Sequence, residues 1–123
     1  MRLEPDNLAA LNSVAWILAT HPDPKLRDAN QAIEFAERAA ELTRYQNAAV
    51  LDTLAAAYAA AGQFDRAVTT AQTALELASA AQNEQLANHI RKQLELYKQA
   101  KPVRNSTNGK HPGKEKISNG PRP

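Results

Sequence analysis

The side chains of this sequence that could carry acid–base or metal chemistry are few and widely separated. The chain has three histidines, His21, His89 and His111, and no cysteine. Disulfides, thiolate metal sites and cysteine nucleophiles are therefore excluded. Asp23 and Asp28 lie near His21, but proline-rich turns commonly use aspartate to cap the backbone. Because neither a histidine pair with metal-ligand spacing nor a glycine-rich phosphate loop occurs, we expect no enzyme, no cofactor and no metal site.

Five helices are predicted to position these side chains. Small or apolar residues recur at intervals of three and four, which indicates helices with one buried side. The helix ends carry their own signals: Asp6 or Asn7 and Asp28 are suitable N-caps, prolines in 21–24 end the first helix, and Gly62 suits a left-handed C-cap. The predicted ranges are about 8–20, 29–42, 48–61, 64–80 and 83–99.

Two parts of the chain repeat one pattern at a fixed spacing. Ala32 and Ala67 are separated by 35 residues, and so are Ala39 and Ala74. A period of this length, with small residues at constant helical offsets, indicates stacked helical hairpins. The first copy has five extra residues within 20–28, which lengthen a surface loop at little energetic cost and could serve binding.

The second copy resembles the tetratricopeptide repeat. The matching positions are Leu51, Leu54, Ala55, Tyr58, Gly62, Phe64, Ala67 and Ala74. The stretches 11–16, 21–24 and 50–58 are also similar to the C-terminal ends of bacterial proteins of this family. The resemblance implies an all-α, right-handed superhelix in residues 1–100, with hairpins at about 8–42 and 48–80 and a capping helix at about 83–99. It also implies the end of a longer array.

By the same resemblance, the protein is a non-catalytic scaffold that presents a concave surface to a peptide or protein partner. The first and third helices would line that surface, and the residues expected to contact the partner are Asn12, Trp16, Thr20, Asp52, Thr53 and Ala56. Neighbouring positions on the same faces are Ala9, Ser13, Ala49 and Ala60. Two interpretations of Trp16 stay open, because it could anchor a partner or cover the inserted loop by packing on Pro22 or Leu26.

The charge of the chain is divided unevenly. Residues 1–100 carry nine Lys and Arg against twelve Asp and Glu, whereas residues 101–123 carry six against one. This basic tail is rich in Gly, Pro, Asn, Ser and Lys, and we expect it to be disordered. It could be a solubilising tail, a poorly selected terminus, or a contact to nucleic acid or an anionic surface, although the absence of aromatic residues disfavours nucleic acid.

Two other functions remain open alongside the scaffold. The chain could be the C-terminal part of a larger enzyme that carries such repeats, for example a glycosyltransferase or kinase, or an accessory protein that acts through its basic tail. No apolar run approaches the ~20 residues that span a bilayer, and no signal-peptide core is present, so the default expectation is a cytoplasmic protein. Leu3 and Leu11 would leave an apolar N-terminal end that self-association or further repeats could cover.

Overall fold

The computed structural model describes residues 7–103, and residues 1–6 and 104–123 lie outside the described part of the chain. The described residues form five α-helices and one short 3₁₀-helix, with no β-strand, which confirms the expected all-α fold. The helices are α1 (Leu8–Thr20), η1 (Pro24–Leu26), α2 (Ala29–Leu42), α3 (Ala48–Ala60), α4 (Phe64–Ala80) and α5 (Glu84–Lys98). Every α-helix lies within one residue of its predicted range. None of the helices in 7–103 has the length and apolar character needed to cross a bilayer.

Side-chain caps fix where most of the helices begin. Asn7, Asp28, Asn47 and Asn83 each accept a hydrogen bond from the backbone N–H three residues further along, at 3.0–3.1 Å. These bonds satisfy donors that the first helical turn would otherwise leave without partners. Only α4 begins without such a bond, after Gln63.

The turn between α3 and α4 confirms the expectation for Gly62. This residue has a φ of 81°, in the left-handed region that glycine adopts at little cost. The Gly62 N–H donates to the Ala59 carbonyl, and the Gln63 N–H donates to the Tyr58 carbonyl, so the last carbonyls of α3 are satisfied. The turns that follow α2, α4 and α5 use non-glycine residues with positive φ, among them Tyr45, Gln82 and Ala100.

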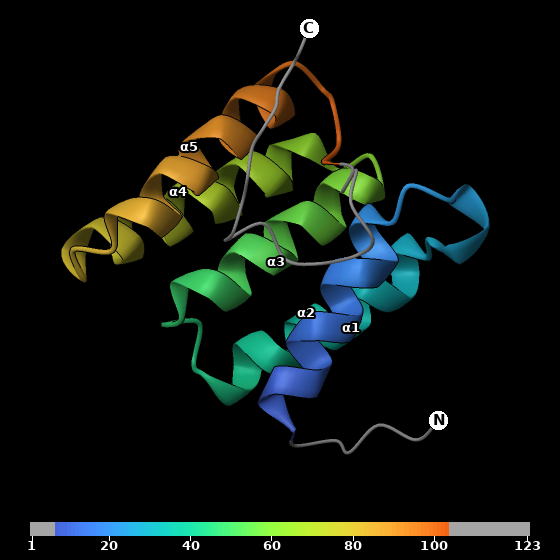
Figure 1. The fold of residues 1–123 in the computed structure, drawn as a ribbon, viewed down its shortest axis with the longest axis horizontal. Coiled ribbons are helices and arrows are strands. Elements are labelled where there is room, and N and C mark those ends of the chain that lie inside the picture. The colour runs from blue at the N-terminus through green and yellow to red at the C-terminus, as the bar shows by residue number, and fades with distance from the viewer. Residues whose placement is uncertain (1–6, 104–123) are drawn as a thin grey trace, which may run out of the picture.

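The five helices are arranged in two layers (Figure 1). In this view α1, α3 and α5 form the nearer layer, and α2 and α4 lie behind them. The central helix α3 contacts each of the other four helices. As a result, every residue from Val50 to Ala59 is buried. We call the nearer side of the molecule the α1/α3/α5 face.

Alanine allows these helices to approach one another closely. Ala36, Ala39, Ala71 and Ala74 are all fully buried, at 0 % exposure. Ala39 and Ala74, which the repeat identified as small residues at constant helical offsets, are thus on the buried sides of α2 and α4. The larger residues Leu75 and Leu77 are only partly buried and pack against the edge of this core.

The longer loop of the first hairpin is tied to the helices on either side. The Asp28 N–H donates to the Leu18 carbonyl at 2.9 Å. The Arg27 guanidinium donates to the carbonyls of His21 and Pro22, at 2.8 and 3.3 Å. The loop is therefore held by backbone hydrogen bonds, and its apolar residue Leu26 stays 53 % exposed.

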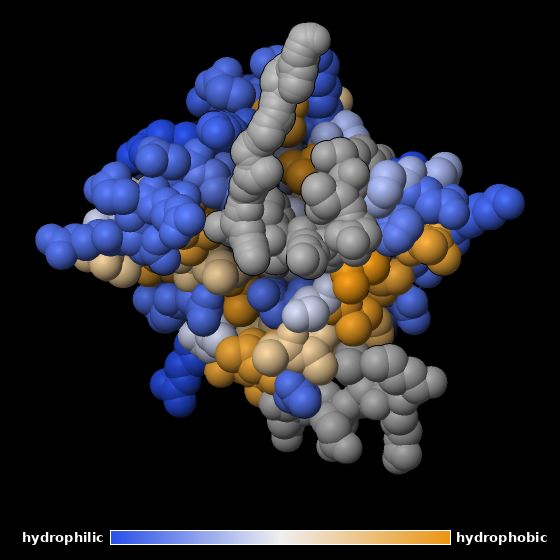
Figure 2. Space-filling view, viewed as in Figure 1, coloured by the Kyte–Doolittle hydropathy of each residue, from blue (hydrophilic) through white to orange (hydrophobic). Residues whose placement is uncertain are grey.

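The apolar surface of α1 differs from the expected one. Leu11 was expected at an open N-terminal end, but it is 2 % exposed because α1 packs on both α2 and α3; Leu3 lies outside the described residues. Ile17 is instead 37 % exposed. Figure 2 shows apolar side chains along α1 and its following loop, and hydrophilic ones over α5.

Candidate functional site

The residues expected to contact a partner lie on the α1/α3/α5 face, but most of them are buried. Trp16 is 1 % exposed, and Thr20 and Asp52 are 0 % exposed. Thr53 and Ala56 are buried in the same way, whereas Asn12 is only partly buried. The helices that carry these residues were predictable from the sequence, whereas their depth of burial was not.

The two threonines among them satisfy their polar groups within their own helices. The Thr20 hydroxyl donates to the Trp16 carbonyl at 2.8 Å, and the Thr53 hydroxyl donates to the Ala49 carbonyl at 3.2 Å. A buried hydroxyl that is already hydrogen-bonded to the preceding turn contributes little to recognition. Thr20 and Thr53 therefore act mainly as small, satisfied packing residues.

Trp16 is directed towards α5. Its ring centroid lies 6.2 Å from that of His89, with the two ring planes tilted by 50°. Pro22 and Leu26, the loop residues that Trp16 was expected to cover under one interpretation, are both exposed. The Trp16 ring therefore connects α1 with α5 across the α1/α3/α5 face.

Four polar side chains from α3 and α5 meet beside Trp16, and we call these four residues with Trp16 the polar cluster. His89 Nε2 lies 3.2 Å from Asp52 Oδ2. On the other side, His89 Nε2 lies 2.6 Å from the Gln93 amide nitrogen, and the Tyr97 hydroxyl lies 3.3 Å from Gln93 Oε1. The Asp52 side chain is 1 % exposed and the His89 side chain 18 % exposed. The cluster is thus almost closed, with the imidazole nearest to solvent.

The hydrogen bonds of the polar cluster follow one side of α5. The Tyr97 hydroxyl donates to Gln93 Oε1, and the Gln93 amide nitrogen faces His89 Nε2. The same imidazole nitrogen also lies beside the Asp52 carboxylate, so His89 joins the row of polar side chains on α5 to α3.

Tyr97 remains a neutral phenol in this environment. Burial raises the pKa of its hydroxyl well above the usual 10, and the negative charge of Asp52 raises it further. A buried, uncharged hydroxyl of this kind serves as a hydrogen-bonding group rather than as a base.

Sequence reasoning missed the contribution of α5 to this site. His89, Gln93 and Tyr97 follow one another at intervals of four, so they share one side of a helix. That spacing was a usable signal, but contacts to a partner were expected only from the first and third helices. Only the position of α5 against α3 brings His89 to Asp52, which lies 37 residues earlier in the sequence.

The polar cluster is suited to recognition through hydrogen bonds and charge. The described residues include no group of three or more His, Asp or Glu that could hold a metal ion. The nearby hydroxyl of Thr53 is directed to its own helix backbone. On α1, Asn12 Oδ1 is buried and accepts no hydrogen bond from the described residues. Within the polar cluster, the imidazole is the group nearest to solvent.

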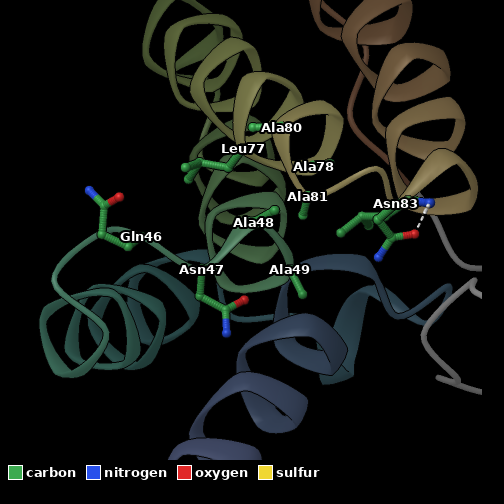
Figure 3. A pocket seen from close by; sticks show the side chains of 10 residues that line it. Gln46, Asn47, Ala48, Ala49, Leu77, Ala78, Ala80, Ala81 and Asn83 are labelled. Atoms are coloured by element: carbon green, nitrogen blue, oxygen red, sulfur yellow. Dashed lines mark hydrogen bonds between the residues drawn. The ribbon is translucent and has the colours of Figure 1, made fainter.

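A separate hollow lies at the end of the second hairpin (Figure 3). Its volume is about 520 Å³, and the first turn of α3, the last turn of α4 and the start of α5 surround it. Half of its lining residues are alanines, and none of the lining residues is charged. Asn47 and Asn83 already use their side-chain oxygens to cap α3 and α5, so this hollow offers little specific chemistry.

The resemblance to the tetratricopeptide repeat depends on the sequence pattern alone. Comparison of the chain with protein-family models, with curated proteins and with solved structures gave no match in any of the three.

Proposed function

We propose that this protein is a non-catalytic interaction scaffold of the tetratricopeptide-repeat kind, with its hairpins in a right-handed superhelical stack. The α1/α3/α5 face is the proposed binding surface for a peptide or protein partner. A cytoplasmic location of the protein is part of the same proposal. The observation that carries the proposal is the polar cluster, which places charged and hydrogen-bonding groups inside an alanine-packed core.

Packing alone does not explain why these polar side chains are present in the core. Alanine fills the interfaces between the other helices, and all of α3 from Val50 to Ala59 is buried. Transferring a carboxylate from water to such a place costs several kcal/mol unless it is well paired. An apolar residue at position 52 would avoid that cost, so a function in recognition explains why an aspartate is present.

The accessible edge of the face defines where a partner would first make contact. Ser13 on α1 is exposed, Asn12 on α1 and Ala49 on α3 are partly buried, and His89 on α5 is partly exposed. We call these four residues the face rim. A ligand seated there would meet the imidazole, which lies beside the buried Trp16 ring.

A peptide selection against the full chain tests this proposal. Peptides enriched from a displayed random library would be measured by fluorescence anisotropy on the wild type, on Ser13→Arg and on Ala49→Arg. Thr69→Arg and Thr73→Arg serve as matched controls, since both threonines are exposed on α4 in the other layer. We expect the rim variants to lose at least about tenfold in affinity, or about 1.4 kcal/mol, with the control variants unchanged. Selected peptides that bind all five proteins equally would refute the proposal, as would a selection that enriches none.

A further inference from the structure

A contact between a carboxylate and an imidazole joins α5 to α3 at the edge of the core. Asp52 Oδ2 on α3 lies 3.2 Å from His89 Nε2 on α5. The Asp52 side chain is 1 % exposed, whereas the His89 side chain is 18 % exposed. Protons from the solvent can therefore reach the imidazole while the two helices stay packed, although the carboxylate lies inside the core.

The strength of this contact depends on the charge of the imidazole. Histidine is the side chain whose charge ordinarily changes between about pH 5 and 8. A protonated His89 and an ionised Asp52 attract each other as opposite charges, and burial of the carboxylate strengthens this attraction relative to water. Once His89 has lost its proton, only a contact between a neutral ring and the carboxylate remains. The contact is thus strongest on the acid side of neutrality.

The side chains closest to His89 on α1 and α5 are uncharged. The Trp16 ring of α1 lies 6.2 Å from the imidazole ring, and α1 contains no titratable side chain. On α5, the Gln93 amide nitrogen lies 2.6 Å from His89 Nε2. Tyr97 keeps its proton, because burial and then the charge of Asp52 raise the pKa of its hydroxyl well above 10.

The other titratable groups of the neighbouring helices are occupied elsewhere or lie in solvent. Tyr58, the second titratable residue of α3, donates to Glu37 on α2. Solvent and salt screen the charged side chains of α4, of α5 and of the segment that follows it, because all of them are exposed: Asp65, Arg66, Glu76, Glu84, Arg91, Lys92, Glu95, Lys98 and Lys101. We therefore assign the pH response of the contact to His89 and Asp52.

The position of α5 in the fold makes it sensitive to such a contact. α5 packs mainly on α4 and contacts α3 much less. It is also the last helix of the described chain, and terminal elements open locally at a lower free energy than the centre of a domain. A weaker contact between α3 and α5 therefore favours opening of α5 while α1, α2 and α3 stay packed together.

We propose that His89 is a pH-dependent latch, which holds α5 against α3 when the imidazole is protonated and holds it less firmly when the imidazole is neutral. As the pH rises from about 5.5 to 8, local opening of α5 becomes more frequent. His89 also belongs to the face rim, so the latch alters the proposed binding surface. That consequence rests on the proposed function, whereas the latch itself does not.

Hydrogen exchange followed by NMR on the full chain tests the latch. Exchange rates of the α5 amides, corrected for the intrinsic effect of pH, give the protection of that helix between about pH 5.5 and 8. His89→Gln keeps a polar side chain that cannot take up a proton, and Asp52→Asn keeps the shape of the carboxylate without its charge. The matched control combines His21→Gln with His111→Gln, which removes the other two histidines.

In the wild type and in the control variant, we expect the protection of α5 to fall at least about fivefold between pH 5.5 and 8. His89→Gln and Asp52→Asn should show no such fall. The amides of α2, which packs on α1 and α3, are the internal reference and should keep their protection. If Asp52→Asn is too unstable to measure, the comparison of the wild type with His89→Gln still decides.

Three results would overturn the latch. These are a flat profile for α5 in the wild type, an equal fall in His89→Gln, and an equal fall in α5 and α2, which would indicate an effect on the whole fold. The exchange measurement needs no partner, so each of these results leaves the scaffold proposal untouched. A failed peptide selection, in turn, leaves the latch as a property of the fold.

Discussion

The hydrogen bond between Tyr58 and Glu37 gives a prediction that the structure makes quantitative. The Tyr58 hydroxyl on α3 donates to Glu37 Oε2 on α2 at 2.8 Å, across the two hairpins. Burial of the phenol, followed by the hydrogen bond to Glu37 and the charge of Glu37, raises the pKa of Tyr58 to about 12. The Arg66 guanidinium, 5.5 Å from the centre of the ring, opposes this shift.

The sign of the effect on stability follows from this raised pKa. Below pH 10 Tyr58 is protonated in both the folded and the unfolded chain, so its contribution is fully present. Between pH 10 and about 12 the unfolded chain loses the proton while the folded chain keeps it, so stability falls. The shift of two pKa units corresponds to at most about 2.7 kcal/mol in the free energy of unfolding. Arg66 is exposed and Glu37 only partly buried, so solvent screens the charges near the Tyr58 hydroxyl. We therefore expect the loss of unfolding free energy to be about half of this maximum.

Urea unfolding of the wild type and Tyr58→Phe across this pH range measures the effect. At pH 7 Tyr58→Phe should be about 1 kcal/mol less stable than the wild type, because it lacks the hydrogen bond to Glu37. As the pH rises from 10 to about 12, the stability of the variant should fall less than that of the wild type. Glu37→Gln should lower the pKa of Tyr58, seen in the absorbance of tyrosinate, without returning it to 10, because burial persists. Tyr45→Phe is a comparison variant and not a neutral control, because burial, followed by the charges of Glu41 and Glu37, also raises the pKa of Tyr45. Parallel pH profiles for Tyr58→Phe and the wild type would refute this reasoning.

The remaining predictions concern the helix ends and the alanine core, and chemical denaturation checks each of them. Gln63→Asp should stabilise the protein by about 0.5–1 kcal/mol, because α4 lacks a side-chain N-cap; no gain would indicate that the turn cannot accept the cap geometry. Asn47→Ala should cost about 1 kcal/mol through loss of the α3 cap. Gly62→Ala should cost about 1 kcal/mol from its positive φ alone, since nothing lies within 4 Å of an added Cβ. Ala71→Leu should cost about 1–3 kcal/mol by overpacking a fully buried position, whereas Thr69→Leu on the exposed side of α4 should change stability by less than about 0.5 kcal/mol.

The helices could be predicted from the sequence because their signals are local. The prolines after His21, the cap residues Asn7 and Asp28, and Gly62 act within a turn or two of the chain. Alanine spacing likewise identified the buried sides of α2 and α4, because helical periodicity translates directly into a face. The helix ends at Tyr45, Gln82 and Ala100 adopt positive φ without glycine, and no local rule distinguishes them in advance.

The candidate site was harder to predict because its parts meet only in three dimensions. Asp52 could be placed on α3, and His89 on α5, but their contact depends on how α5 packs beside α3. Trp16 illustrates the same difficulty, since the position of one neighbouring helix decides whether its ring covers the loop or packs beside His89. For Asn12 and Trp16 the face was predictable, whereas the depth of burial was determined by the tertiary packing around α1.

The position of the polar cluster also changes the interpretation of α5. A helix that only capped the array would need an apolar side against α4 and a solvated outer side. Ile90 and Leu94 are buried as such a cap requires. His89, Gln93 and Tyr97, however, place a run of hydrogen-bonding groups beside Asp52 and Trp16. α5 packs mainly on α4 and contacts α3 much less, and the Asp52–His89 pair joins α5 to α3. The last helix therefore adds polar groups to the proposed binding face in addition to covering α4.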